Sequence, residues 1–127
     1  MAAENIVMMS ATDTAAAIKA KTFSPLDAVR AYLDRIDRLD SRLSAYITVC
    51  HEEALDAAEQ AELALARGDE LGPLFGVPIA IKDQFWTAGI LTTNGSKVYE
   101  DFVPNEDSTV VSRLKQAGGI LLGKLNL

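Results

Sequence analysis

The stretch from Gly72 to Asp83, Gly-Pro-Leu-Phe-Gly-Val-Pro-Ile-Ala-Ile-Lys-Asp, constrains the fold of this chain more than any other. Its centre is apolar and partly β-branched and is bounded by glycine and proline, which predicts a short buried strand. Lys82 stands where this strand ends. Because burying an unpaired ammonium group is costly, Lys82 is either a side chain that reaches solvent or a lysine held for chemistry. Charges normally surface at strand ends, so position alone favours the solvent-exposed interpretation.

Two helix start signals precede this strand. Ser10–Asp13 has the form of a capping box and predicts a helix that runs to about Lys21. Ser24 at the N-cap, Pro25 at the first helical position and Asp27 three residues after the cap predict a second helix. The apolar stripe of this second helix, which we expect to face a core as far as about Leu39, consists of Leu26, Val29, Leu33 and Ile36.

A strand and a third helix follow. The short run Ala45–Cys50 is rich in β-forming residues and predicts a strand. A helical pattern then runs from His51 or Glu52 to Arg67. Gly68 provides the C-terminal stop of that helix. The narrow stripe that we expect to allow close helix packing consists of Ala54, Ala58, Ala61 and Leu65.

The segment after the central strand predicts a turn, a helix and another strand. Asn94-Gly95 is suited to a tight turn. Asp107 or Ser108 caps a helix that ends at Gly118-Gly119. The apolar run Ile120–Leu122 then predicts a strand. A strand, a connection that contains a helix and a further strand form a βαβ unit, so we expect parallel strands, a right-handed crossover and helices on both faces.

The composition limits the classes of function. A chain of 127 residues with 49% hydrophobic residues is long enough for one domain with a modest core. Its net charge of −6 argues against a nucleic-acid or anionic-membrane surface, because those partners select basic patches. Cys50 is the only cysteine, and the sequence has neither a signal peptide nor a long apolar run, which favours a cytoplasmic location without a membrane span.

The sequence offers few sets of residues for catalysis. His51 is the only histidine, lacks a serine in a Gly-x-Ser-x-Gly elbow and makes a poor metal site by itself. Cys50 precedes it, but neighbours on a strand point to opposite faces, so we set a Cys-His pair aside. No phosphate-binding loop is present and the carboxylates are spread along helix surfaces, so we expect neither a metal nor a cofactor. Lys82 remains, because a desolvated neutral amine can act as a general base.

The run Gly72–Asp83 resembles the lysine segment of the amidase-signature enzymes. The similarity in order and spacing extends from about Ser24 to Leu127, which is most of the chain. Besides the lysine segment, the matching blocks are Gly89 with Thr92-Thr93, Gly95-Ser96, Asp107–Val111 with Leu114, and Ala117–Asn126.

The resemblance implies an α/β fold of the amidase-signature type, with a mixed sheet wrapped by helices. Of that fold we expect only the N-terminal portion: a helical layer, the first strands and a βαβ-like unit. Residues 1–127 would form the N-terminal part of a single amidase domain. Within it, residues 1–70 would be mainly a helical layer, and residues 71–127 would be the start of the catalytic core.

In the family that the chain resembles, the lysine of this motif is the base of a Ser–cis-Ser–Lys triad, and it corresponds to Lys82. Both serines lie in a Gly/Ser-rich segment that comes later in the family's sequences. We therefore expect the chain alone to be inactive and its function to need the missing C-terminal part of the same domain. The serines that this chain has after Lys82, namely Ser96, Ser108 and Ser112, lie in other blocks.

The resemblance implies hydrolysis of the C–N bond of a small-molecule amide, without a cofactor. An alternative is the A subunit of a glutamyl-tRNA amidotransferase, which releases ammonia from glutamine inside a complex. A further alternative is a truncated, non-catalytic dimerisation module. The N-terminal helical layer often contributes to dimer contacts in the family, so a homodimer is also an expectation.

Overall fold

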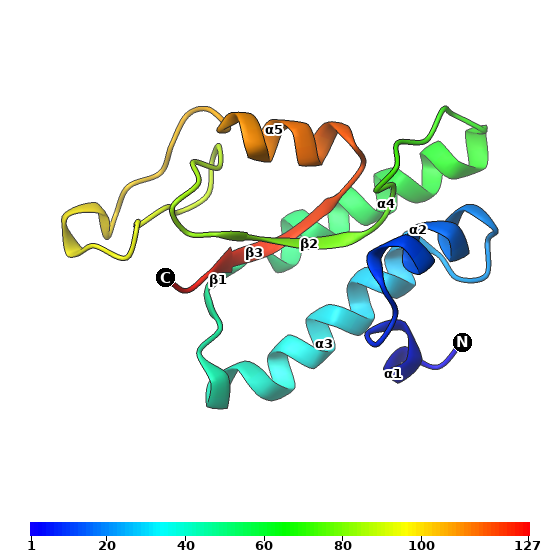
Figure 1. Cartoon of the computed structure of the whole chain (residues 1–127), viewed down its shortest axis with the longest axis horizontal. Helices are drawn as coiled ribbons and strands as arrows, with labels where there is room; N and C mark the ends of the chain where they lie inside the picture. The colour runs from blue at the N-terminus through cyan, green and yellow to red at the C-terminus, as the bar shows by residue number, and fades with distance from the viewer.

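The computed structural model describes residues 1 to 127, in which helices pack around one three-stranded sheet (Figure 1). The strand order is β1–β3–β2, so β3 lies in the centre. β3 is antiparallel to β1 and parallel to β2. The sheet is therefore mixed, and the parallel strands of the predicted βαβ unit are confirmed. The strands comprise Tyr46–Val49 for β1, Pro78–Lys82 for β2 and Ile120–Leu125 for β3.

The N-terminal helices begin where the capping signals predict. α2 (Ala11–Lys19) starts after Ser10, whose hydroxyl accepts a bond from the Asp13 N–H at 3.1 Å. A complete capping box forms only at α3 (Pro25–Leu43), where the Asp27 carboxylate also accepts from the N–H of Ser24. A short helix, α1 (Ala3–Ile6), precedes them.

The predicted end of α3 near Leu39 is wrong, because the helix continues to Leu43. Ser44 then adopts a left-handed conformation with φ of 51°. The Asp40 carboxylate accepts bonds from the N–H groups of Ala45 at 2.8 Å and Tyr46 at 3.2 Å, and it thereby joins the last turn of α3 to β1. The loss of apolar periodicity after Leu39 reflects solvent exposure of the last turn, not the end of the helix.

Two apolar clusters join α3 to its neighbours. The first places Leu33 and other residues of the predicted α3 stripe against α4 (His51–Arg67) and against β3. Ala54 and Ala58 of α4 are completely buried there, which confirms the close packing predicted from their small size. The second cluster packs α1, α2 and α3 around Phe23 and Phe75. Gly68 ends α4 with φ of 75°, as predicted.

The opposite face of the sheet is covered by α5 (Thr109–Gln116), which Figure 1 shows on the side away from α3. Val111 of α5 packs with Ile81 of β2 and Leu121 of β3 in a third apolar cluster. Gly118 then turns the chain with φ of 96°, and a Cβ there would collide with the backbone of Phe75. The last strand extends to Leu125, three residues beyond the apolar run that predicts it.

A shift of register between β2 and β3 leaves Leu122 of β3 without a partner. Ile79 pairs with Leu121, whereas Ala80 pairs with Gly123 and Ile81 with Lys124. An extra residue of this kind re-aims the side chains that follow it. Lys124 therefore shares the α5 side of the sheet with Ile81 instead of following Leu122 towards α3 and α4.

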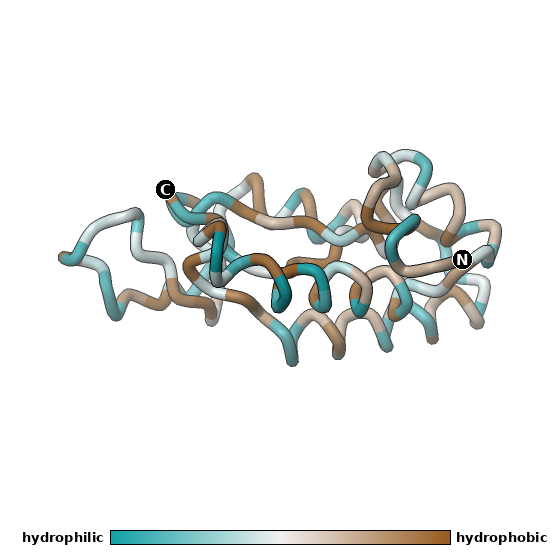
Figure 2. The backbone as a smooth tube through the Cα atoms, turned by 90° about the horizontal axis from the view of Figure 1, so that it is seen from below, coloured by the Kyte–Doolittle hydropathy of each residue, from teal (hydrophilic) through white to brown (hydrophobic).

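The hydropathy of the chain agrees with this layered arrangement. Figure 2 shows hydrophobic and hydrophilic residues alternating along the helices, as expected of helices with one buried face. None of the helices combines the length and the apolar character that crossing a membrane requires.

Candidate active site

Lys82 is the last residue of β2, and it lies at the carboxyl end of the parallel strand pair. Its side chain is exposed, and no ion pair in the structure includes it. Alternation along β2 places it on the face opposite to Ile81. Ligands of open α/β sheets bind outside the carboxyl ends of the strands, so Lys82 stands where a substrate would approach.

A buried ion pair lies immediately beside Lys82. The side chains of Asp83 and Lys124 are both 0% exposed, and Lys124 Nζ lies 3.4 Å from Asp83 Oδ1. The ammonium group also donates to the Phe85 carbonyl at 3.0 Å and to Thr92 Oγ1 at 2.7 Å. Burial lowers the pKa of Lys124, and the attraction of the Asp83 carboxylate opposes that shift.

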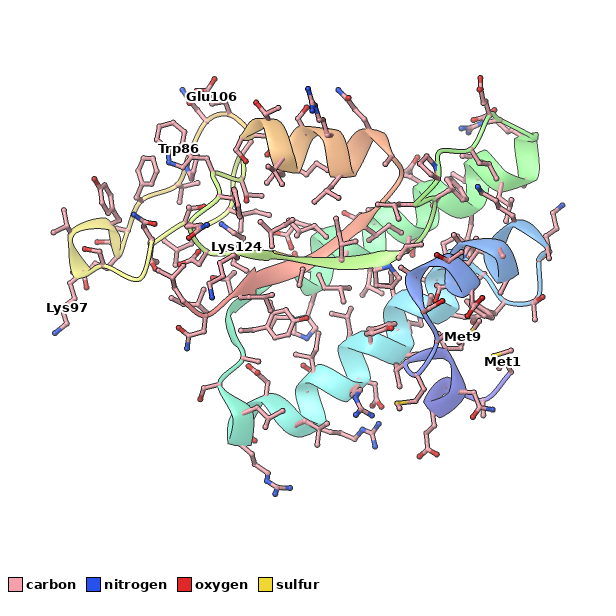
Figure 3. The ribbon with its side chains drawn as sticks, in the orientation of Figure 1. Met1, Met9, Trp86, Lys97, Glu106 and Lys124 are labelled. Atoms are coloured by element: carbon pink, nitrogen blue, oxygen red, sulfur yellow. The ribbon has the colours of Figure 1, made fainter.

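The two threonines of the loop after β2 complete this arrangement. The Asp83 carboxylate accepts bonds at Oδ2 from both the N–H and the hydroxyl of Thr93. Asp83 Oδ1 has no hydrogen-bond partner. The one ion pair that it forms is with the ammonium group of Lys124. Asp83, Thr92, Thr93 and Lys124, which we call the polar cluster, are all buried. Figure 3 labels Lys124, which comes from the central strand.

The loop that supplies these threonines closes with the predicted tight turn. Asn94 and Gly95 both have positive φ, at 55° and 66°, and the Ser96 N–H donates to the Thr93 carbonyl at 2.9 Å. Beyond the turn, Trp86 and Tyr99 each pack edge-on against Phe102. A hollow of about 110 Å³ opens there, lined by Gln84, Trp86, Thr92, Asn94, Tyr99 and Phe102.

A second hollow of about 280 Å³ lies on the other side of the turn and includes Thr93 and Gly95. Two hollows that are larger still lie around Phe23, where α2 gives way to α3. One measures about 470 Å³ and the other about 420 Å³. Phe23 and Asp27 contribute to both. Neither hollow includes a residue of β2, β3 or the loop between β2 and α5, so they are separate from the lysine site.

The other candidates from the sequence are not brought to Lys82. His51 lies at the start of α4, where its Nε2 is 2.8 Å from Asp37 Oδ1. Cys50 is buried as the N-cap of α4, so the pair lies at a helix start and not along a strand as we assumed. Burial raises the pKa of the Cys50 thiol to about 11, with Glu53 adding to the shift and Lys124 opposing it. A thiol of that kind is a poor nucleophile at neutral pH.

The serines that follow Lys82 are not brought to it either. Ser96 caps the short helix η1 (Lys97–Tyr99) through a bond from the Val98 N–H. The hydroxyl of Ser108 is buried without a partner at the start of α5. No group of three histidine, cysteine or carboxylate side chains is gathered in a way that could hold a metal.

Comparison with known proteins places this site in a family. The model of the amidase family matches residues 27–127. The A subunit of the glutamyl-tRNA(Gln) amidotransferase of Geobacter sp. strain M21 is 50% identical over 109 residues, which is 86% of this chain and 22% of that protein. The protein of the same name from Geobacter sulfurreducens is 53% identical over 103 residues, or 81% of this chain and 21% of that protein. The chain thus spans about a fifth of the length of these relatives.

Solved structures of the same family superpose closely. The native peptide amidase of Stenotrophomonas maltophilia gives a TM-score of 0.88 at 34% identity, over 94% of this chain and 25% of that one. A bacterial aryl acylamidase of the amidase-signature family gives 0.86 at 28% identity, over 93% of this chain and 25% of that one. This chain belongs to the amidase-signature family, and the α/β fold implied by the resemblance is confirmed.

The sequence interpretation missed the polar cluster. Lys124 and Asp83 belong to matched blocks, yet nothing in their spacing indicates that they meet, because 40 positions separate them along the sequence. The available signal was the lysine inside an otherwise apolar strand, Ile-Leu-Leu-Gly-Lys-Leu. A buried lysine needs a partner, so the strand itself indicated a carboxylate nearby.

Proposed function

We propose that the protein containing this chain hydrolyses the C–N bond of a linear carboxamide by a Ser–cis-Ser–Lys triad, with Lys82 as the base. The observation that carries the proposal is the contrast between two lysines at one edge of the sheet. Lys124 is buried and paired, whereas Lys82 is exposed and outside every ion pair. Lys82 is therefore the amine that remains available to exchange a proton with a reacting group.

In this proposal the neutral amine of Lys82 accepts a proton from the bridging serine, which takes one from the nucleophilic serine. The nucleophile attacks the amide carbonyl, and backbone N–H groups stabilise the oxyanion. The proton returns to the leaving nitrogen as the C–N bond breaks, and water then releases the acid from the acyl-enzyme. Both serines would lie in the part of a longer polypeptide that follows, in keeping with relatives about four times as long.

The domain arrangement of the proposal follows the same reasoning. The chain would be the N-terminal part of a single amidase domain, with residues 1–70 as a mainly helical layer. Residues 71–127 would start the catalytic core. On this view residues 1–127 alone turn over no amide, and the protein works in the cytoplasm.

The experiment replaces Lys82 in the full-length enzyme and follows ammonia release from L-glutamine, benzamide, propionamide and a peptide amide, here called the four-amide panel. Arginine cannot act as a base because it stays protonated. We expect Lys82→Arg and Lys82→Ala to lose about 10²–10⁴-fold in kcat, with the circular dichroism spectrum unchanged. The control is Lys97→Arg at an exposed lysine of η1, which should keep its activity. Near-normal turnover by Lys82→Arg would restore the interpretation of a merely solvent-exposed lysine.

A second candidate is the glutamine-hydrolysing component of a tRNA-dependent amidotransferase. Its support is the name shared by relatives that are 43% to 53% identical to this chain. These relatives are more similar to the chain than the two solved amidases described above, which are 28% and 34% identical to it. The four-amide panel separates the two candidates. A strong preference for L-glutamine, with a rate of hydrolysis that increases when partner subunits are added, favours the second candidate. Efficient hydrolysis of the other three amides without partner subunits favours the stand-alone amidase.

A further inference from the structure

The polar cluster is not explained by stability alone. Two fully buried charges lose their hydration, and well-packed apolar side chains in place of such a pair are often neutral or stabilising. Here the loss is not offset by ideal geometry, because Asp83 Oδ1 lies 3.4 Å from the ammonium group and has no hydrogen bond. An arrangement that contributes little to the free energy of folding indicates another role.

The contacts of Asp83 indicate that role, because they fix the backbone that directly follows Lys82. The N–H of Asp83 donates to the Leu125 carbonyl at 3.0 Å, and its carbonyl accepts from the Asn94 N–H at 3.1 Å. Its carboxylate accepts two bonds from Thr93. The main chain of Asp83 is thus held on one side by β3 and on the other by the loop.

Lys124 extends the same arrangement from the central strand. Gly123 allows β1 to approach closely, since a Cβ there would collide with the Thr48 carbonyl oxygen. The unpartnered Leu122 then directs Lys124 to the α5 side, where it reaches the Phe85 carbonyl and Thr92. Its ammonium group joins β3 to the first turn after Lys82 and to the far side of the loop.

We propose that the polar cluster consists of positioning residues for the reaction, which hold the end of β2 so that the Lys82 amine meets its proton donor. This inference rests on the proposed function of Lys82. Its physical reason is that proton transfer needs heavy atoms within hydrogen-bond reach. A misplacement of about 1 Å can cost ~10²-fold in rate without contact between the altered residue and the substrate.

The test uses Thr93→Val in the full-length enzyme, because valine keeps the shape of threonine. It removes the hydroxyl bond to Asp83, together with the bond that the same hydroxyl accepts from the Gly95 N–H at 3.2 Å. We expect kcat on the best substrate of the four-amide panel to fall about 10-fold to 10²-fold while KM stays within about twofold. Thr93→Ser restores the hydroxyl and should recover most of kcat. A purely structural role for Thr93 predicts no selective loss of kcat.

The matched control is Thr14→Val in α2. Thr14 is also a buried threonine, and its hydroxyl bonds to the Ser10 carbonyl at 2.9 Å, in a helix that lies away from Lys82. The Thr14→Val variant should lose about as much free energy of unfolding as Thr93→Val, and its kcat should not change. If Thr93→Val does not fold, Thr92→Val instead removes one of the two hydrogen-bond acceptors of Lys124, with the same expected loss of kcat.

The outcomes separate this inference from the proposed function. Activity in Lys82→Ala overturns the proposed function and, with it, the positioning role. Loss of activity in Lys82→Ala, together with Thr93→Val and Thr92→Val as active as Thr14→Val, overturns the positioning role alone. Equal changes in kcat and KM, without recovery in Thr93→Ser, would also contradict it.

Discussion

Two regions of the molecule differ in the side chains that hold them together. One is the interface between α3 and α4, and the other is the sheet edge where β2 and β3 end. The buried part of the first is apolar, with Leu33 against two completely buried alanines of α4, and its polar pair, His51 with Asp37, lies at the exposed edge. The second buries an ion pair and two threonines where the strands end. One region is held by the removal of apolar surface from water, the other by directional bonds between specific atoms.

This difference separates the part of the molecule that carries the fold from the part that we propose to carry the chemistry. Apolar packing tolerates exchange of similar side chains, because the hydrophobic effect has no direction. A buried polar network does not, since each unpaired group keeps the full cost of its lost hydration. The two regions should therefore respond differently to substitution, and the predictions below use that difference.

The largest effect on stability is expected at Lys124. Lys124→Met leaves the Asp83 carboxylate buried without its charge partner, and should lower the free energy of unfolding by about 3–5 kcal/mol. The double variant Asp83→Asn/Lys124→Met removes both charges and should recover at least about half of that loss. Urea unfolding measures both. Additive losses in the double variant would show that the two side chains do not interact.

The apolar interface is tested at Leu33. Leu33 is 5% exposed, and Leu33→Asp places a carboxylate against α4 and β3, so we expect a loss of about 2–4 kcal/mol. Leu43→Asp makes the same exchange at a side chain that is 67% exposed on the same helix, and should cost less than about 1 kcal/mol. Unfolding midpoints of the two variants that coincide would mean that the α3 stripe is not core.

The smallest effect compares two serines at helix starts. Ser24 accepts the Asp27 N–H at 3.0 Å, so Ser24→Ala should cost about 1 kcal/mol. Ser108 holds the same position at α5, but its hydroxyl has no partner, and Ser108→Ala should be within about 0.5 kcal/mol of neutral. Thermal unfolding of the two variants measures how much one N-cap hydrogen bond contributes to stability. A loss at Ser108 equal to that at Ser24 would contradict this account.

Sequence patterns predicted the apolar region better than the polar one. The periodicity of Leu33 and its neighbours placed α3 correctly, although it ended the helix four residues early because the last turn is exposed. The strand ends were harder, because hydrophobic pattern carries no information about which buried charge meets which. The apolar run 120–122 indicated β3, but the lysine and glycine that continue it to Leu125 broke the pattern and hid both the irregular register and the ion pair.

The sequence motif predicted Lys82 as a site residue, whereas the side chains around it became known only from the structure. The Gly72–Asp83 run identified the family and the end of β2. It could not indicate that Asp83 contacts Lys124 and Thr93, since both of these partners lie outside the motif, Thr93 in the following loop and Lys124 in β3.

The most direct test of the central claim replaces Lys82 by cysteine in the full-length enzyme and alkylates the new thiol. Treatment with 2-bromoethylamine forms a thioether side chain that ends in a primary amine, nearly as long as lysine. Treatment with (2-bromoethyl)trimethylammonium forms one of similar reach whose charge is permanent and which cannot accept a proton. Cys50 is buried and its thiol has a pKa raised to about 11, so it should react slowly, and treated unmodified enzyme serves as the control.

We expect Lys82→Cys to be inactive and the primary amine to restore at least about a tenth of kcat on the four-amide panel, because a base must be able to lose and regain a proton. The permanent cation should restore none. Equal recovery with both reagents would show that Lys82 supplies only charge, and full activity in untreated Lys82→Cys would show that it supplies nothing to the reaction.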